Sequence, residues 1–361
     1  MRTLLGLLGG LALSSIAACG ASQNHVPSSQ SELAPLATFE QMPSGVALWG
    51  ERVFLSFPRW SSGDAPTVAE WVNGELVAFP SSAANDHTAG SAAMHSVNGL
   101  HVDRHGRLWM LDNGRVDLGA AIAGSPKVVV WDLQRNEEAF RIEFDESIAP
   151  LAGSFLNDLA VDLDHGAVYI TESGIGGTPA LIVHDIATGN TRRVLDGHSS
   201  VLPEFGLRVR DETVTVTLGG SEREWRIGAN SLVLSDDAAT LFYGATTSPT
   251  AYAIPTSALR DPTLQTEWVE TRVRVAATKN HSDGMTLCGG QLVWASPETG
   301  GVCVGTSDEP LCVELPGRPF SVGVECDGDH VMVTSAPLHQ MPILHAGDDR
   351  RDAANHLWRV P

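Results

Sequence analysis

The sequence predicts an all-β protein, a six-bladed β-propeller whose blades are four-stranded antiparallel sheets. Short apolar stretches with alternating polar positions recur along the chain, and turns rich in Gly, Asp and Asn separate them. The chain contains 36 Gly and 20 Pro in 361 residues, so few stretches are long enough for extended helices. The same internal order of strands and turns recurs in six units, which is typical of a propeller.

Two stretches show the repeat most clearly. Residues 100–114 (LHVDRHGRLWMLDNG) and 159–174 (LAVDLDHGAVYITESG) share an apolar strand, an Asp/Gly turn and a second apolar strand that ends in polar residues. Further strands follow at 129–133 and 182–186. A β-sandwich with coincidentally similar strands is the alternative, and six recurrences make it the weaker one. The same opening recurs in the segments 44–55, 230–243, 283–294 and 320–334.

The last unit lacks one strand. After the fifth unit, strands are predicted only at 319–325, 330–335 and 355–360, whereas an additional strand at 35–41 precedes the first unit. We expect this N-terminal strand to complete the last blade, because closing the ring removes exposed strand edges. Residues 196–228 fit none of the units and are expected to form an insertion between the third and fourth blades.

The N-terminus is predicted to be a lipoprotein signal peptide. Arg2 precedes an apolar run over residues 4–16, which is too short to span a bilayer and has the form of a secretory signal. The run ends in Ile-Ala-Ala-Cys, which is similar to a bacterial lipobox, so Cys19 is the expected lipidation site. An ordinary signal peptide cleaved nearby is the alternative. The predicted organisation is a signal peptide with lipobox at 1–19, a flexible tether at 20–34 and the propeller at 35–361.

The composition limits the partners that the protein can bind. The chain has 43 Asp and Glu against 23 Lys and Arg, a formal net charge of −20, and the basic residues form no cluster. Binding of nucleic acid or of anionic lipid headgroups needs grouped cations, so both are disfavoured. We expect an exported monomer of the cell envelope that attaches to the membrane only through its lipid and binds a small-molecule ligand.

Four cysteines besides the lipobox cysteine lie in the last two units, as expected for an exported protein. Four cysteines allow three pairings. Cys303 and Cys312 flank a turn, which suits a hairpin bridge, whereas Cys288 and Cys326 end the innermost strands of neighbouring blades. We therefore expect the disulfides Cys303–Cys312 and Cys288–Cys326. A cysteine-based metal site is disfavoured, since no two cysteines are closely spaced.

Several segments resemble the major royal jelly/Yellow protein family, in their order more than in any single motif. The resemblance runs from about residue 35 to the C-terminus and implies a six-bladed propeller that is normally secreted. It also implies kinship with senescence-marker and gluconolactonase-type propellers. Family members are functionally diverse, and some bind small amines in the channel or convert pigment precursors. The matching segments are PSGVA at 43–47, GRLWMLDNG at 106–114, VVVWDL at 128–133, FLNDLAVD at 155–162 and SDGM at 282–285.

The candidate site is the mouth of the central channel, where the innermost strand of each blade begins. Amide and carboxylate oxygens that converge there suit a hard cation, although turn formation is the better explanation for each residue taken alone. Kinship with the lactonases implies metal ligands at Asn157, Asn230 and Asp283, with calcium or zinc as the cofactor. Ser44 stands where those enzymes have Glu, which lowers the ligand charge. The residues at the six strand starts are Ser44, Asn98, Asn157, Asn230, Asp283 and Phe320.

If the protein is an enzyme, Asp283 and His281 are the candidate catalytic residues, because a histidine two residues away can act as a general base. His95 and His101 are expected to be solvent-exposed loop residues. Four tryptophans follow strand alternation and are expected between the blades, namely Trp49, Trp109, Trp131 and Trp294.

The favoured function is binding of a small organic molecule at the channel mouth. The alternatives are a metal-dependent lactonase or esterase of gluconolactonase type and a protein-interaction scaffold. A Glu supplied from elsewhere in the chain beside Asp283 would favour the hydrolase, and a dry, aromatic-lined mouth would favour ligand binding.

Overall fold

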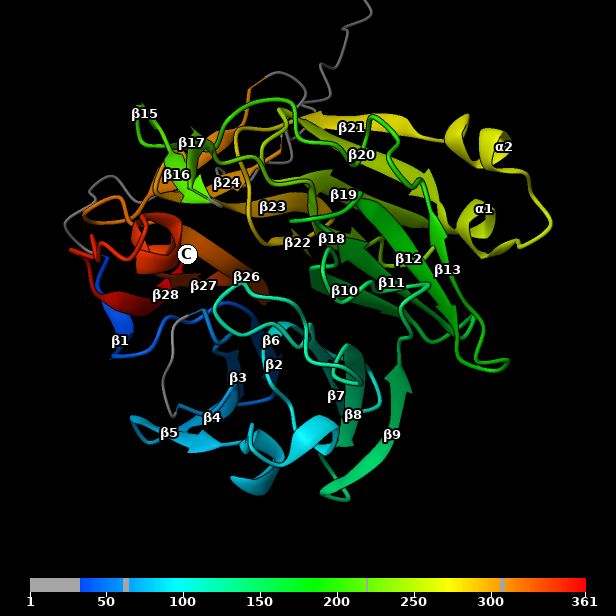
Figure 1. Cartoon of the computed structure of the whole chain (residues 1–361), viewed down its shortest axis with the longest axis horizontal. Coiled ribbons are helices and arrows are strands. Elements are labelled where there is room, and N and C mark those ends of the chain that lie inside the picture. The colour runs from blue at the N-terminus through cyan, green and yellow to red at the C-terminus, as the bar shows by residue number, and fades with distance from the viewer. Residues whose placement is uncertain (1–32, 61–64, 219, 306–308) are drawn as a thin grey trace, which may run out of the picture.

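The computed structural model describes residues 33–60, 65–218, 220–305 and 309–361. In these residues, six four-stranded antiparallel sheets surround a central channel, so the predicted six-bladed propeller is confirmed (Figure 1). The predicted signal peptide, Cys19 and most of the tether lie outside the described residues. None of the helices in the described part of the chain has the length and apolar character needed to cross a membrane.

The first three blades follow one another in sequence, each with its innermost strand first. Blade 1 comprises β2 (Val46–Trp49), β3 (Arg52–Ser56), β4 (Val68–Val72) and β5 (Glu75–Ala78). Blade 2 comprises β6 (Val97–Val102), β7 (Arg107–Asp112), β8 (Lys127–Asp132) and β9 (Glu137–Glu143). Blade 3 comprises β10 (Leu156–Asp162), β11 (Ala167–Glu172), β12 (Ala180–Asp185) and β13 (Thr191–Val194).

The last three blades keep this order, and two short helices, α1 (Thr256–Arg260) and α2 (Thr266–Glu270), precede the outer strand of blade 4. Blade 4 comprises β18 (Ala229–Leu234), β19 (Thr240–Ala245), β20 (Thr250–Pro255) and β21 (Arg274–Thr278). Blade 5 comprises β22 (Met285–Cys288), β23 (Gln291–Ser296), β24 (Gly301–Val304) and β25 (Leu311–Glu314). Blade 6 comprises β26 (Ser321–Asp327), β27 (His330–Ser335), β28 (Asn355–Val360) and β1 (Pro35–Phe39).

The ring closes as the strand count predicts. β1 pairs antiparallel with β28, from Pro35 opposite Trp358 to Phe39 opposite Asn355. Phe39 is 9% exposed and packs edge-to-face on Phe57, with ring centroids 5.9 Å apart. The outer strand of blade 6 therefore comes from the start of the described chain, and the other three strands come from its end.

Apolar clusters fill the interfaces between neighbouring blades. Trp109 between blades 2 and 3 and Trp294 between blades 4 and 5 are fully buried, which confirms the position expected for both. Burial of a large apolar side chain contributes roughly 1.5–3 kcal/mol, so these layers are a main source of stability. Residues of the innermost strands, both polar and apolar, line the channel.

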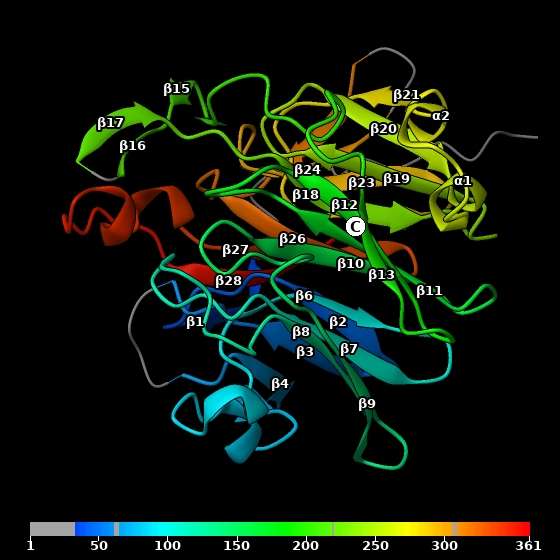
Figure 2. The ribbon, with the colours of Figure 1, turned by 45° about the vertical axis from the view of Figure 1, so that its right-hand side comes forward.

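The predicted insertion is present between blades 3 and 4. It carries two hairpins, β14 (Arg208–Val209) with β15 (Glu212–Thr213) and β16 (Thr215–Leu218) with β17 (Ser221–Glu224). Leu207 and Val216 pack in one apolar cluster with Phe320 and Leu338. The insertion therefore lies beside the excursion between β27 and β28, which contains the 3₁₀ helices η4 (Leu338–Gln340) and η5 (Pro342–Leu344) (Figure 2).

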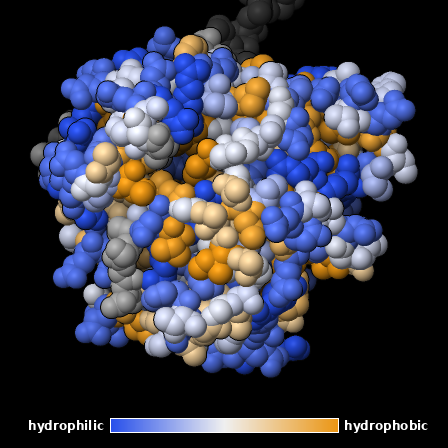
Figure 3. All heavy atoms as spheres, viewed as in Figure 1, coloured by the Kyte–Doolittle hydropathy of each residue, from blue (hydrophilic) through white to orange (hydrophobic). Residues whose placement is uncertain are grey.

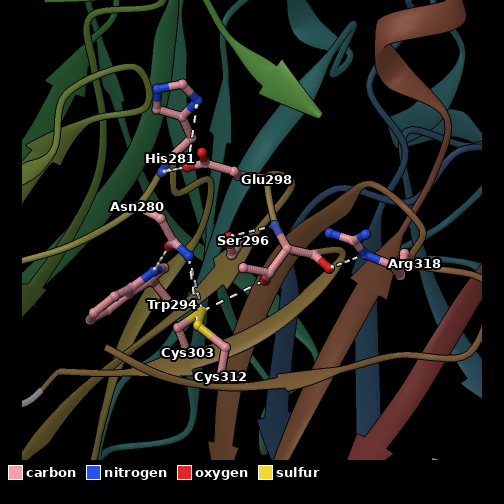
Figure 4. Close-up of a disulfide and its surroundings, with 9 residues drawn as sticks. Asn280, His281, Trp294, Ser296, Glu298, Cys303, Cys312 and Arg318 are labelled. Carbon is pink, nitrogen blue, oxygen red and sulfur yellow. Dashed lines mark hydrogen bonds and ion pairs between the residues drawn. A yellow bond between two sulfur atoms is a disulfide. The ribbon is translucent and has the colours of Figure 1, made fainter. Parts of the chain in front are cut away.

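Both predicted disulfides are formed. Cys303 and Cys312 lie opposite each other on β24 and β25 with their Cα atoms 4.0 Å apart. Cys288 and Cys326 join the ends of the innermost strands of blades 5 and 6, with a Cα–Cα distance of 5.6 Å. Figure 4 shows the first bridge beside Asn280, whose Nδ2 donates a hydrogen bond to Cys303 Sγ at 3.4 Å.

Both lysines of the sequence are buried. Lys127 is completely inaccessible, and its Nζ donates to Asp112 Oδ2 at 3.1 Å and to the Ala93 carbonyl at 2.8 Å. Lys279 is 2% exposed, and its Nζ donates to the carbonyl oxygens of Ala245 at 2.8 Å and Ser248 at 2.5 Å. The basic side chains on the described surface are therefore arginines and histidines.

Candidate functional site

The structure brings five of the six predicted channel residues together around one end of the channel. They line both the channel cavity, with a volume of about 190 Å³, and a smaller cavity at the mouth, of about 60 Å³. The sixth, Phe320, lines the mouth alone. We call the set of five the polar ring, which consists of Ser44, Asn98, Asn157, Asn230 and Asp283.

Local backbone features aim the ring side chains at the channel. The pairing register shifts around Asn98, Asn157 and Asn230, so each asparagine lies in a bulge of its innermost strand. A bulge bends the strand and re-aims a side chain. Gly45 and Gly323 allow the innermost strands to approach closely, since a Cβ on Gly323 would lie 2.2 Å from the Ser44 carbonyl oxygen and one on Gly45 2.6 Å from that of Asn98.

Hydrogen bonds join the ring residues into a chain that runs from blade 2 to blade 5. Asn98 Nδ2 donates to Asn157 Oδ1 at 3.1 Å, and Asn157 Nδ2 donates to Asn230 Oδ1. Asn230 Nδ2 in turn donates to Asp283 Oδ1 at 2.9 Å. The carboxylate thus ends a row of oriented amides. Asn98 Oδ1, at the other end, is buried and accepts no hydrogen bond from the described residues.

Three carboxylates line the channel, and two of them, Asp158 and Glu325, were missed by the sequence analysis. Burial raises the pKa of Asp283 to about 7, against the hydrogen bond from Asn230 and together with the charge of Asp158. Burial also raises the pKa of Asp158 to about 7, against backbone hydrogen bonds. Burial and the charge of Asp158 raise the pKa of Glu325 to about 8. No Lys or Arg of the described chain lines this cavity.

The mouth above the ring is predominantly apolar. Its aromatic side chains come from separate parts of the chain, and the insertion supplies Trp225 and Ile227. The excursion of blade 6 supplies Leu338 and Met341. Figure 3 shows hydrophobic residues gathered near the centre of this face. The aromatic residues that line the mouth are Trp60, Phe155, Trp225 and Phe320.

The sequence profile of the major royal jelly protein family matches residues 95–292, which is more than half of the chain. The chain belongs to the major royal jelly protein family. It is 30% identical over 241 residues to Protein yellow of Drosophila pseudoobscura pseudoobscura, covering 62% of this chain and 41% of the relative. Protein yellow of Drosophila melanogaster is 28% identical over 239 residues, covering 62% and 42%. The chain thus spans about two fifths of the length of these curated relatives.

Solved structures with low sequence identity share the fold. A gluconolactonase of Xanthomonas campestris superposes with a TM-score of 0.52 at 17% identity, covering 91% of this chain and 89% of that one. A luciferin-regenerating enzyme gives a TM-score of 0.53 at 13% identity, with 90% and 92% covered. At these identities the likeness shows the fold alone, because one propeller fold supports many functions.

The structure does not bring His281 and Asp283 into one cavity. His281 is 5% exposed and lines a separate cleft next to Lys279 and Glu298. Its Nδ1 accepts a hydrogen bond from the Arg208 backbone N–H at 2.8 Å. The backbone N–H of His281 donates to Glu298 Oε2 at 3.1 Å (Figure 4). Burial lowers the pKa of His281, against the charge of Glu298. His281 therefore cannot act as the general base for a molecule bound at the ring.

Two other expectations about histidines are wrong. His95 is 1% exposed and its Nε2 lies 3.0 Å from the Gly90 carbonyl oxygen, so it is a core residue and not a solvent-exposed loop residue. His101 lies on β6 and lines the channel, where burial lowers its pKa. His101 is three residues beyond Asn98, and the bulge in β6 between them adds one residue to the alternation. Both side chains can therefore face the channel.

The ring provides oxygen ligands for a metal but little charge. The described residues contain no cluster of three or more His, Cys, Asp or Glu side chains suited to a metal ion. The amide oxygens and the Asp283 carboxylate are ligands of the type that calcium prefers, whereas zinc favours nitrogen and sulfur. The unpartnered Asn98 Oδ1 also fits a cation. Asp158 supplies the second negative charge next to Asp283 that Ser44 does not.

Proposed function

We propose that this protein is an exported, lipid-anchored family member that binds a small organic molecule at the channel mouth. The observation that supports the proposal is that the mouth has an apolar wall and a polar floor. Aromatic and aliphatic side chains line its wall, and the polar ring forms its floor. Small-molecule sites commonly combine an apolar wall with a few oriented polar groups. The apolar part of the ligand would contact Trp60 and Trp225, and its polar end would contact the ring.

The charge of the floor favours a cationic head group. Asp283 is the one formally charged residue of the ring, and its Oδ1 is held by the Asn230 amide. The described lining of the mouth includes no Lys or Arg that could neutralise it. An ammonium group placed there would pair with the carboxylate and donate to the neighbouring amide oxygens. A carboxylate or phosphate ligand would meet repulsion instead.

Export is supported by the disulfides and by the predicted signal. Disulfides form and persist in oxidising compartments outside the cytosol. The two bridges described above, together with the lipobox-like sequence that ends at Cys19, therefore support an extracytoplasmic protein held by a lipid.

Titration with an arylalkyl amine tests the proposal. We expect phenethylammonium to quench tryptophan fluorescence of the soluble domain and to bind at least about tenfold more tightly than phenethyl alcohol, since a charge-assisted hydrogen bond contributes roughly 1.5–3 kcal/mol. Asp283→Asn should abolish that preference, and Trp225→Ala should weaken both probes. Trp268→Ala is the matched control, because Trp268 lies on α2 and is 56% exposed. Equal binding by Trp225→Ala and the parent would contradict the proposal, as would no binding at all.

A metal-dependent lactonase or esterase is the second candidate. It is favoured by the convergence of Asn157, Asn230 and Asp283 on one cavity and by Asp158 as an additional carboxylate beside Asp283. A divalent cation held there would polarise a lactone carbonyl. With its pKa near 7, the Asp158 carboxyl suits the role of general base better than His281 does. Lactone hydrolysis that requires calcium and is lost in Asp283→Asn would establish this function.

A further inference from the structure

Two of the channel carboxylates are not part of the polar ring. Asp158 lies on β10 of blade 3 and Glu325 on β26 of blade 6, and both line the channel cavity. Blades 3 and 6 are three positions apart in a ring of six, so these two carboxylates extend from opposite sides of the channel. Each is beyond the start of its innermost strand, on the side of the ring away from the apolar mouth.

Neither carboxylate is neutralised by the protein. The described residues provide no ion-pair partner for Asp158 or Glu325, and the lining contains no Lys or Arg. Asp158 Oδ1 accepts a hydrogen bond from the Leu159 backbone N–H at 2.9 Å, whereas the Glu325 carboxylate accepts none from the residues that the structure describes. His101 is the one basic side chain in the lining, and burial lowers its pKa. Unpaired carboxylates in a buried cavity are costly.

A buried amide oxygen in the same cavity, Oδ1 of Asn98, also accepts no hydrogen bond from the described residues. Asn98 is 2% exposed and lines the same cavity, and its Oδ1 has no donor among the described residues. The Nδ2 of Asn98 donates to Asn157, so this hydrogen bond sets the orientation of the amide and leaves its oxygen without a donor. A buried acceptor without a hydrogen-bond donor destabilises the folded state. A cation would satisfy this oxygen and both carboxylates together.

We propose that the channel binds a divalent cation of the calcium type between Asp158 and Glu325, with Asn98 Oδ1 as a further protein ligand. This site is distinct from the one formed by Asn157, Asn230 and Asp283. It offers two carboxylates in place of one, and all three protein ligands are hard oxygens, which calcium binds in sets of six to eight completed by water. The bound ion links blades 2, 3 and 6 across the channel.

Calcium titration of the purified soluble domain by calorimetry tests the assignment. We expect the parent to bind calcium and Glu325→Gln to bind it at least about tenfold more weakly, because a charged ligand becomes a neutral one of the same shape. Asp158→Asn should show the same loss. Asp283→Asn should weaken calcium binding less than either Glu325→Gln or Asp158→Asn does, since it removes a neighbouring charge and not a ligand.

Asp329→Asn is the control for the general effect of removing an acidic residue, because Asp329 is exposed in the turn that follows β26. It should bind calcium as the parent does, and circular dichroism should show native folding for every variant. The proposal is overturned if the parent gives no binding heat with millimolar calcium. It is also overturned if Glu325→Gln keeps the affinity of the parent while Asp283→Asn loses it, since the ion would then lie at the ring.

Discussion

Replacing Phe39 by alanine tests how much the closure of the ring contributes to stability. Phe39 lies on β1, is 9% exposed and belongs to the apolar cluster between blades 6 and 1. Truncation of a buried phenylalanine costs about 3–5 kcal/mol, and loss of the edge-to-face contact with Phe57 is included in that cost. Because a small fraction of the side chain is exposed, we expect a loss of about 3 kcal/mol in the free energy of unfolding.

The matched control lies on the same strand. Leu36 is 45% exposed, so Leu36→Ala should change stability by less than about 0.5 kcal/mol. Urea denaturation of the oxidised soluble domain, followed by tryptophan fluorescence, measures both variants against the parent. If Phe39→Ala is no less stable than Leu36→Ala, then β1 does not close the propeller in solution and the reasoning from the strand count is refuted.

Three further predictions concern the anchor, the ring and the channel. Cys19→Ala should move the protein from the membrane fraction to the soluble fraction, and unchanged fractionation would exclude lipidation at this residue. In the Glu325→Gln background, Ser44→Glu should restore calcium binding detectable by calorimetry, because the polar ring then contains a second carboxylate besides Asp283. Ser44→Gln, which adds no charge, should not restore it. Without calcium, the contribution of Glu325 to the unfolding free energy should fall as pH rises between about pH 5 and 8, since the folded state holds the Glu325 proton to a pKa of about 8 and the unfolded state only to its ordinary value of 4.5. The unfolding free energy of the parent should therefore decrease relative to that of Glu325→Gln across this range, and an identical pH profile for this variant and the parent would contradict the assignment of the titrating group.

Much of the fold could be predicted because its signals are local. Each blade repeats one order of strands and turns, and counting the strands was enough to assign residues 35–41 to the last blade. The disulfides followed from where strands end, since Cys288 and Cys326 close neighbouring innermost strands. The ring residues followed from the same logic, because the start of each innermost strand faces one channel.

What the sequence could not supply depends on contacts between distant segments. The sequence spacing suggested that His281 and Asp283 share a site, but the two side chains line different cavities. The backbone N–H of Arg208, in the insertion, donates a hydrogen bond to the His281 imidazole. The apolar mouth depends on Trp225 from that insertion, whose packing no periodicity reveals. Glu325 was missed although a charged residue in the middle of an innermost strand is itself a signal.

The burial of both lysines makes amine chemistry a reporter of local opening. In the sequence after Cys19, the side-chain amines are those of Lys127 and Lys279, and both are enclosed. An amine-reactive label or a lysine-specific protease can reach them only when the structure opens around them. Lys279 borders a surface cleft, whereas Lys127 is paired with Asp112 inside blade 2. Modification at Lys279 should therefore report opening near the insertion, and modification at Lys127 should report opening within blade 2.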